Sequence, residues 1–135
     1  MPLNLGTSTS VGGKILGNPW RGLIEHQHQY RVNIADLTTG EVDADGYIKP
    51  GVPLSSANPA GRVTAGRVEG CTIESIKVAA SNSPAALTAA GVIELTIGTI
   101  GQVNRKIIED NLGRPLTAAE IAGFTAPGCL VKLLA

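Results

Sequence analysis

Closely spaced turn residues constrain this chain more than any other feature of its sequence. Residues 46–54 read GYIKPGVPL. Pro50-Gly51 fits the two central positions of a type II turn, because proline fixes φ at the first and glycine accepts a positive φ at the second. We therefore predict a very short strand at 47–49 with a turn at each end. Pro53 lacks an N–H group and is expected at a sheet edge or at the start of the next segment.

The composition extends this pattern to the whole chain. Its 135 residues include 17 glycines and 8 prolines, which favours many turns and one domain. Only 16% of the residues are charged and the formal net charge is zero. A chain so neutral lacks the basic surface of a nucleic-acid or anionic-membrane binder. With 43% hydrophobic residues, it is expected to have part of its surface covered by another chain.

Targeting signals are not evident. No apolar run approaches the ~18 residues that a membrane helix needs. The first residues, MPLNLGTSTSVGG, have neither the cationic start nor the apolar stretch of a secretory signal.

Hydrophobic periodicity predicts strands along most of the chain. In residues 29–37, apolar and polar side chains alternate as in a half-buried strand. The same alternation marks residues 91–100, where Ile93, Leu95 and Ile97 would share one face. Residues 129–134, CLVKLL, are expected to close the chain as a strand.

Two short helices are predicted between these last two strands. The first spans about 102–112, with Val103, Ile107, Ile108 and Leu112 at helical spacing as its core face. The second spans about 118–124, because Thr117 and Glu120 have the spacing of a capping box. The expected fold class is mainly β with a short helical pair, a small α+β domain resembling a β-roll or β-barrel.

The first 20 residues differ from the rest and are predicted to form an extended arm, leaving residues 21–135 as a single domain. Small polar residues and glycines in the arm separate a few apolar anchors: Leu3, Leu5, Val11, Ile15, Leu16 and Trp20. Alone, such a segment buries too little apolar surface to offset its ordering entropy. It must dock either on its own domain or on a partner chain. Trp20 could pin the root of the arm at an interface, or fill the bottom of its own barrel.

Few residues suggest chemistry. In EHQHQ, residues 25–29, His26 and His28 would point to one face of a strand and could be two metal ligands, but no third ligand is near in the sequence. The alternative is a polar strand edge or an interface. No nucleophile elbow of the G-x-S-x-G type occurs. Cys71 and Cys129 match no metal-binding spacing and are expected to be buried free thiols. We expect no enzymatic activity, no metal and no cofactor.

Three segments resemble the head decoration (cement) proteins of tailed bacteriophages, the group represented by the phage lambda decoration protein. They are the Gly/Ser/Thr-rich arm, the turn-bounded strand in GYIKPGVPL, and the closing GTIGQVNRKIIEDNLGRPLTAAEIAGFTAPGCLVKLL. The resemblance implies a small β-roll with little helix. It also implies a structural role without catalysis, on the outer surface of the virion, for a protein made in the host bacterial cytoplasm.

The resemblance further implies the partners. Such proteins typically bind as trimers at three-fold and quasi-three-fold sites, where the arm orders on the major capsid protein and neighbouring subunits are clamped together. The expected partners are thus the major capsid protein and further copies of this chain, with no nucleic acid and no membrane. Two alternatives remain open: another virion component, such as a tail or adaptor subunit, or a small metal-binding domain that uses His26 and His28.

Overall fold

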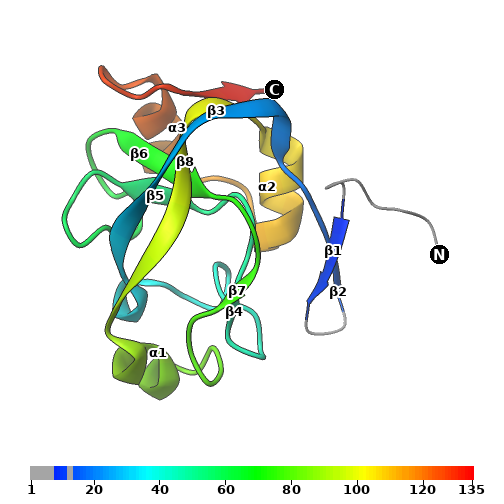
Figure 1. The fold of residues 1–135 in the computed structure, drawn as a ribbon, viewed down its shortest axis with the longest axis vertical. Helices are drawn as coiled ribbons and strands as arrows, with labels where there is room; N and C mark the ends of the chain where they lie inside the picture. Colours follow the sequence, from blue (N-terminus) through cyan, green and yellow to red (C-terminus); the bar gives the residue numbers. More distant parts are fainter. Residues whose placement is uncertain (1–7, 12–13) are drawn as a thin grey trace.

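A five-stranded sheet organises the structure, a computed structural model that describes residues 8–11 and 14–135, with side chains from Leu16 onward. The strand order is β3-β8-β6-β5, and all neighbours on this path are antiparallel. Its strands are β3 (Trp20–Asn33), β5 (Pro53–Ser55), β6 (Val68–Thr72) and β8 (Val92–Asn104). The last strand, β9 (Val131–Leu134), runs parallel to the end of β8. Figure 1 shows β3 and β8 as the two long ribbons that cross the molecule.

Strands β3 and β8 form the longest pairing. Tyr30 lies opposite Leu95, and Val32 opposite Ile93. Leu95 and Ile97 are buried, which confirms the alternation predicted for residues 91–100. The prediction of a strand over 29–37 was wrong at both ends, because β3 begins at Trp20 and Ile34–Asp36 forms a 3₁₀ turn. The first half of β3 is largely exposed, and its apolar residues Leu23 and Ile24 are adjacent in the chain, so the sequence shows no apolar alternation there.

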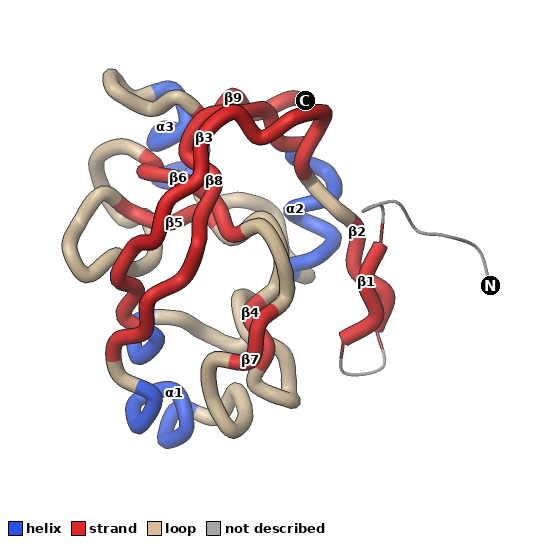
Figure 2. Tube along the Cα trace, viewed as in Figure 1, coloured by secondary structure: helices blue, strands red, loops and turns tan. Residues whose placement is uncertain are grey.

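The turn-bounded strand predicted from GYIKPGVPL is present. Strand β4 (Tyr47–Ile48) pairs with β7 (Ile76–Lys77), and Gly51 has a φ of 84° in the turn that follows. Pro53 begins β5, which lies at the edge of the main sheet. Figure 2 shows β4 and β7 side by side in the lower middle of the molecule, below the main sheet. The mainly β, α+β fold class is thus confirmed.

Three short helices complete the described part of the chain: α1 (Pro84–Ala90), α2 (Arg105–Leu112) and α3 (Ala118–Thr125). In α3, both hydrogen bonds of the Thr117–Glu120 capping box are present, which confirms the helix predicted at about 118–124. In α2, the C-cap Gly113 is left-handed, as glycine permits.

Helix α2 begins three residues later than predicted. Val103 is buried, but it belongs to β8, where it pairs with Leu133 of β9. Asn104 then ends the strand and caps the helix, because its side chain accepts a hydrogen bond from the N–H of Ile107. Of the predicted core face, Ile108 and Leu112 are buried, and Ile107 is only half-buried.

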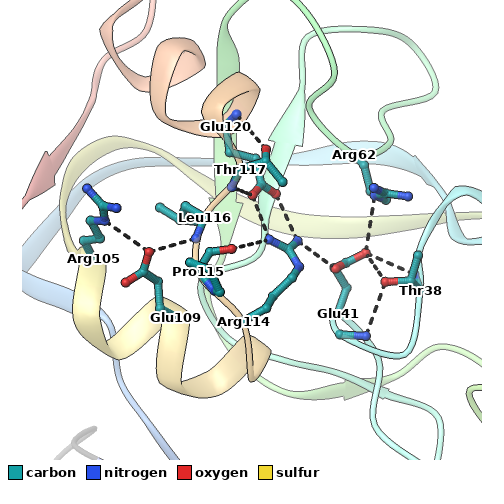
Figure 3. Close-up of polar contacts among 11 residues, drawn as sticks. Thr38, Glu41, Arg62, Arg105, Glu109, Arg114, Pro115, Leu116, Thr117 and Glu120 are labelled. Carbon is teal, nitrogen blue, oxygen red and sulfur yellow. Dashed lines mark hydrogen bonds and ion pairs between the residues drawn. The ribbon is translucent and has the colours of Figure 1, made fainter.

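A buried ion network ties the two C-terminal helices to the rest of the body (Figure 3). Arg114, in the α2–α3 connection, contacts Glu120 at 2.9 Å and Glu41 at 3.0 Å. The two glutamates are only 3% and 1% exposed. Glu120 also closes the capping box of α3, and Glu41 accepts bonds from the N–H and the hydroxyl of Thr38. The hydrogen bond with Glu120 is the largest of the interactions that raise the pKa of Arg114 above its ordinary value.

A second, more exposed ion pair joins α2 to the α2–α3 connection. Glu109 receives the N–H of Leu116 at 2.8 Å and pairs with Arg105 at 3.1 Å. The backbone hydrogen bond is the main cause that lowers the pKa of Glu109. The side chain of Arg105 is 41% exposed, so solvent weakens this pair far more than it weakens the contacts of Arg114.

Replacing Arg114 should therefore unfold the protein more readily than replacing Arg105. Arg114→Met removes the cation that contacts two buried carboxylates, although Glu41 keeps a longer contact of 3.9 Å to Arg62. We expect a loss of about 3 kcal/mol in the free energy of unfolding. Arg105→Met removes an exposed pair and should lose less than ~1 kcal/mol. Urea unfolding of both variants measures the difference. Equal losses would show that the network around Arg114 is not the stronger support.

Candidate functional site

The described part of the arm is a β-hairpin. Strand β1 (Ser8–Val11) pairs antiparallel with β2 (Lys14–Gly17), so that Thr9 faces Leu16 and Val11 faces Lys14. Of the predicted anchors, Leu3 and Leu5 lie outside the described residues, whereas Val11 and Ile15 lie on β1 and β2. Strands β1 and β2 thus pair with each other instead of forming one continuous extended segment. Figure 1 shows the hairpin beside α2, outside the main sheet.

Residues 16–20, which we call the arm root, are attached to the body. Leu16 is only 4% exposed, and the adjacent Gly17 exchanges hydrogen bonds with the side chain of Asn111 on α2. The carbonyl of Pro19 accepts a bond of 2.7 Å from the N–H of Asn104. The arm therefore meets the body at the two ends of α2.

Trp20, the last residue of the arm root, is fixed to the main sheet. Its ring packs over Gly98 and Gly101 of β8 and is 6% exposed, while its Nε1–H donates to the carbonyl of Thr72 at 3.1 Å. Of the two alternatives for this side chain, packing within its own domain is the one observed. Trp20 pins the arm root from inside, so its ring is not a surface contact for another chain.

A groove opens next to the arm root. It has a volume of about 470 Å³ and contains both apolar and polar groups. Its lining residues are Asn18, Trp20, Gly22, Ile24, Gln27, Pro50, Ile73 and Glu74. The groove shares Asn18 and Trp20 with the root, so it lies at the base of the arm.

His26 and His28 both lie on β3, the strand on which the sequence would place them on one face. Their rings are 5.5 Å apart, and the ring of His28 lies 5.6 Å from that of Tyr30. His26 Nδ1 lies 2.8 Å from the hydroxyl oxygen of Thr99, within hydrogen-bond distance, and the same hydroxyl lies 3.4 Å from the carbonyl oxygen of His26. Thr99 thereby fixes how the His26 ring is oriented.

These histidines line a second groove, of about 260 Å³, together with Arg67, Glu69, Thr99, Ile100, Gly128 and Leu130. Arg67 and Glu69 pair with each other at 2.9 Å. Within residues 8–11 and 14–135, no group of three or more His, Cys, Asp or Glu side chains is placed to hold a metal ion.

Both cysteines are free thiols. Cys71 is fully buried, and this burial is the main cause that raises its pKa. Cys129 is half-buried, with its pKa raised for the same main reason. A raised pKa keeps a thiol protonated and unreactive near neutral pH.

Comparison with known proteins identifies no relative: no family model, no curated protein and no solved structure matches this chain. In the described part of the chain, no helix is long and apolar enough to cross a membrane.

Sequence reasoning missed the two asparagines that hold the arm root: Asn104, the N-cap of α2, through its backbone N–H, and Asn111, in α2, through its side chain. Asn104 carried a usable signal, because an asparagine just before a helical pattern is a common N-cap. Asn111 carried only a weak one. Asparagine is a poor helix former, so its place near the end of a predicted helix is unusual but does not reveal its partner. That partner, Gly17, is 94 residues away in the chain.

Gly98→Ala should displace Trp20. A Cβ atom at Gly98 would lie 2.5 Å from Cη2 and 2.6 Å from Cζ2 of the Trp20 ring. We expect a loss of about 1–3 kcal/mol in the free energy of unfolding, as for other overpacked cores. The emission of Trp20, the only tryptophan, should also shift as the ring moves.

Gly40→Ala is the matched control. A Cβ atom there meets its nearest neighbours at an ordinary 3.5 Å. It should change the stability by no more than about 0.5 kcal/mol. If both variants keep native stability and emission, the ring does not depend on the space above Gly98.

Proposed function

We propose that this protein decorates the head of a tailed bacteriophage, binding the outer surface of the capsid and clamping neighbouring major capsid protein subunits. One observation carries the proposal: the arm root is fixed to the body, whereas β1 pairs only with β2 within the described residues. The outer edge of β1 is thus available to a partner strand, held at a defined place on a stable body. Strand addition to such an edge gives affinity through main-chain hydrogen bonds.

The body supports the same role. The hydrogen bonds of Gly17, Pro19 and Trp20 hold the arm root on the body, and the sheet and the buried ion network support that body. A clamp needs such a body, because force on the arm must be transmitted to a second contact. The groove beside Trp20 adjoins the root and offers that contact on the capsid. In this proposal the protein acts by binding alone, without cofactor, membrane or nucleic acid.

Self-association around a three-fold axis of the capsid is part of the proposal. Of the four large apolar side chains exposed among the described residues, Leu23 and Leu130 are the most exposed, at 82% and 61%. Such residues gain stability when another chain covers them. Closed rings satisfy this contact without open-ended assembly.

Removing the outer part of the arm tests the proposal. Deletion of residues 2–13 removes β1 but keeps Leu16 and the rest of the root. We expect the stability to change by no more than about 0.5 kcal/mol, because the body loses no buried side chain of the root. Binding to undecorated heads, measured by co-sedimentation, should fall at least ~100-fold, or about 2.7 kcal/mol.

A length-matched control separates contact from tethering. In this control, Leu3, Leu5 and Val11 are replaced by serine within the full-length arm. It should bind more weakly than the wild type if these side chains fit the capsid. Full occupancy by the truncated protein would contradict the clamp, and sedimentation with tails instead of heads would assign the protein to another part of the virion.

A further inference from the structure

The side chain of Asn111 is buried at the end of α2 and is bonded to the arm root. Asn111 is the penultimate residue of the helix and is 4% exposed. A buried amide must have its N–H and carbonyl groups paired, or it destabilises the fold. Asparagine also gives the helix less intrinsic support than alanine or leucine. We therefore expect Asn111 to have a function other than stabilising the helix.

Three hydrogen bonds supply that role. Oδ1 accepts the N–H of Gly17 at 3.1 Å, and Nδ2 donates to the carbonyl of Gly17 at 2.9 Å and to that of Pro50 at 3.3 Å. The N–H can only donate and the carbonyls can only accept, so the orientation of the amide is settled by its partners. The side chain thus pairs with both polar groups of one arm residue, as a neighbouring strand would.

A second asparagine, Asn104 at the N-cap of α2, uses its side-chain amide in a different way. Asn104 accepts a bond from the N–H of Ile107 and so caps the helix. All three partners of Asn111 lie outside α2, in the arm root and in the Pro50-Gly51 turn. The side chain of Asn104 therefore stabilises the helix, whereas the side chain of Asn111 binds the arm root.

We propose that Asn111 is the positioning residue of the arm, which sets where and in which direction the chain leaves the body. Its importance for capsid binding rests on the proposed function. Beyond Gly17, the root is held independently by the Asn104–Pro19 hydrogen bond and by Trp20. Without the amide of Asn111, β2 loses its polar attachment to α2, and only the packing of Leu16 holds the chain ahead of Asn18. A partner must then order a longer segment, which lowers affinity.

Amide hydrogen exchange measured by NMR tests the positioning directly. In the wild type, the N–H of Gly17 should be protected. Asn111→Ala should speed its exchange by at least ~10-fold, which corresponds to about 1.4 kcal/mol of lost protection. Asn111→Asp should do the same, because it keeps the acceptor but turns the donor into an oxygen that faces two carbonyls. Protection of the Trp20 indole N–H should persist in both variants and shows that the body remains folded.

Asn104→Ala is the matched control, since it removes the asparagine that caps the other end of the same helix. It should speed exchange at Ile107 and leave Gly17 protected. Unprotected Gly17 in the wild type, or unchanged exchange in both Asn111 variants, would overturn the proposal. If Asn111→Ala does not fold, the wild type and Asn111→Asp decide it.

Binding to heads then separates this proposal from the proposed function. Asn111→Ala should bind at least ~10-fold more weakly than Asn104→Ala. If Asn111→Ala frees Gly17 but binds as well as the control, the positioning role is wrong and the decoration role stands. If the wild type itself binds no head, the decoration role is wrong, and exchange at Gly17 alone decides the positioning of the arm.

Discussion

The packing of Trp20 on β8 is the contact from which the rest of the arm root follows. The ring fits because two glycines, Gly98 and Gly101, leave the surface of the central strand open at that point. Its indole N–H reaches the carbonyl of Thr72 on the far side of β8, so one side chain joins β3 to β6 across the sheet. The start of β3 is thereby fixed, and the residues before it must leave the body near α2.

Helices α2 and α3 extend this fixed position from Trp20 to the start of the arm. Arg114 bridges two buried glutamates, of which Glu41 also contacts Arg62, and it anchors the connection between α2 and α3 to the loop that holds Glu41. The end of α2 is then held where Asn111 reaches Gly17. Electrostatic pairing in the C-terminal third thus supports hydrogen bonding to the N-terminal arm, although the two segments are far apart in sequence. A binding arm held in this way needs less ordering when it meets a partner.

Local sequence patterns predicted the elements whose signals are local. Pro50-Gly51, the Thr117–Glu120 capping box and the alternation in residues 91–100 each involve neighbours along the chain, and each prediction was confirmed. The boundary at Val103 was missed because a valine fits both a helical face and a strand, and only pairing with β9 decides between them. The partners of Trp20 and Asn111 could not be predicted, since they depend on the packing of distant segments. The functional role remains a proposal, carried by the arm and by the resemblance to decoration proteins.

A cryo-electron microscopy map of heads decorated with this protein tests the central claim most directly. The account predicts bodies grouped around the three-fold and quasi-three-fold positions. From each arm root at Leu16, density should continue onto the major capsid protein, with β1 paired to one of its strands. Bodies on the capsid whose arms turn back onto their own surface, without touching the shell, would contradict it.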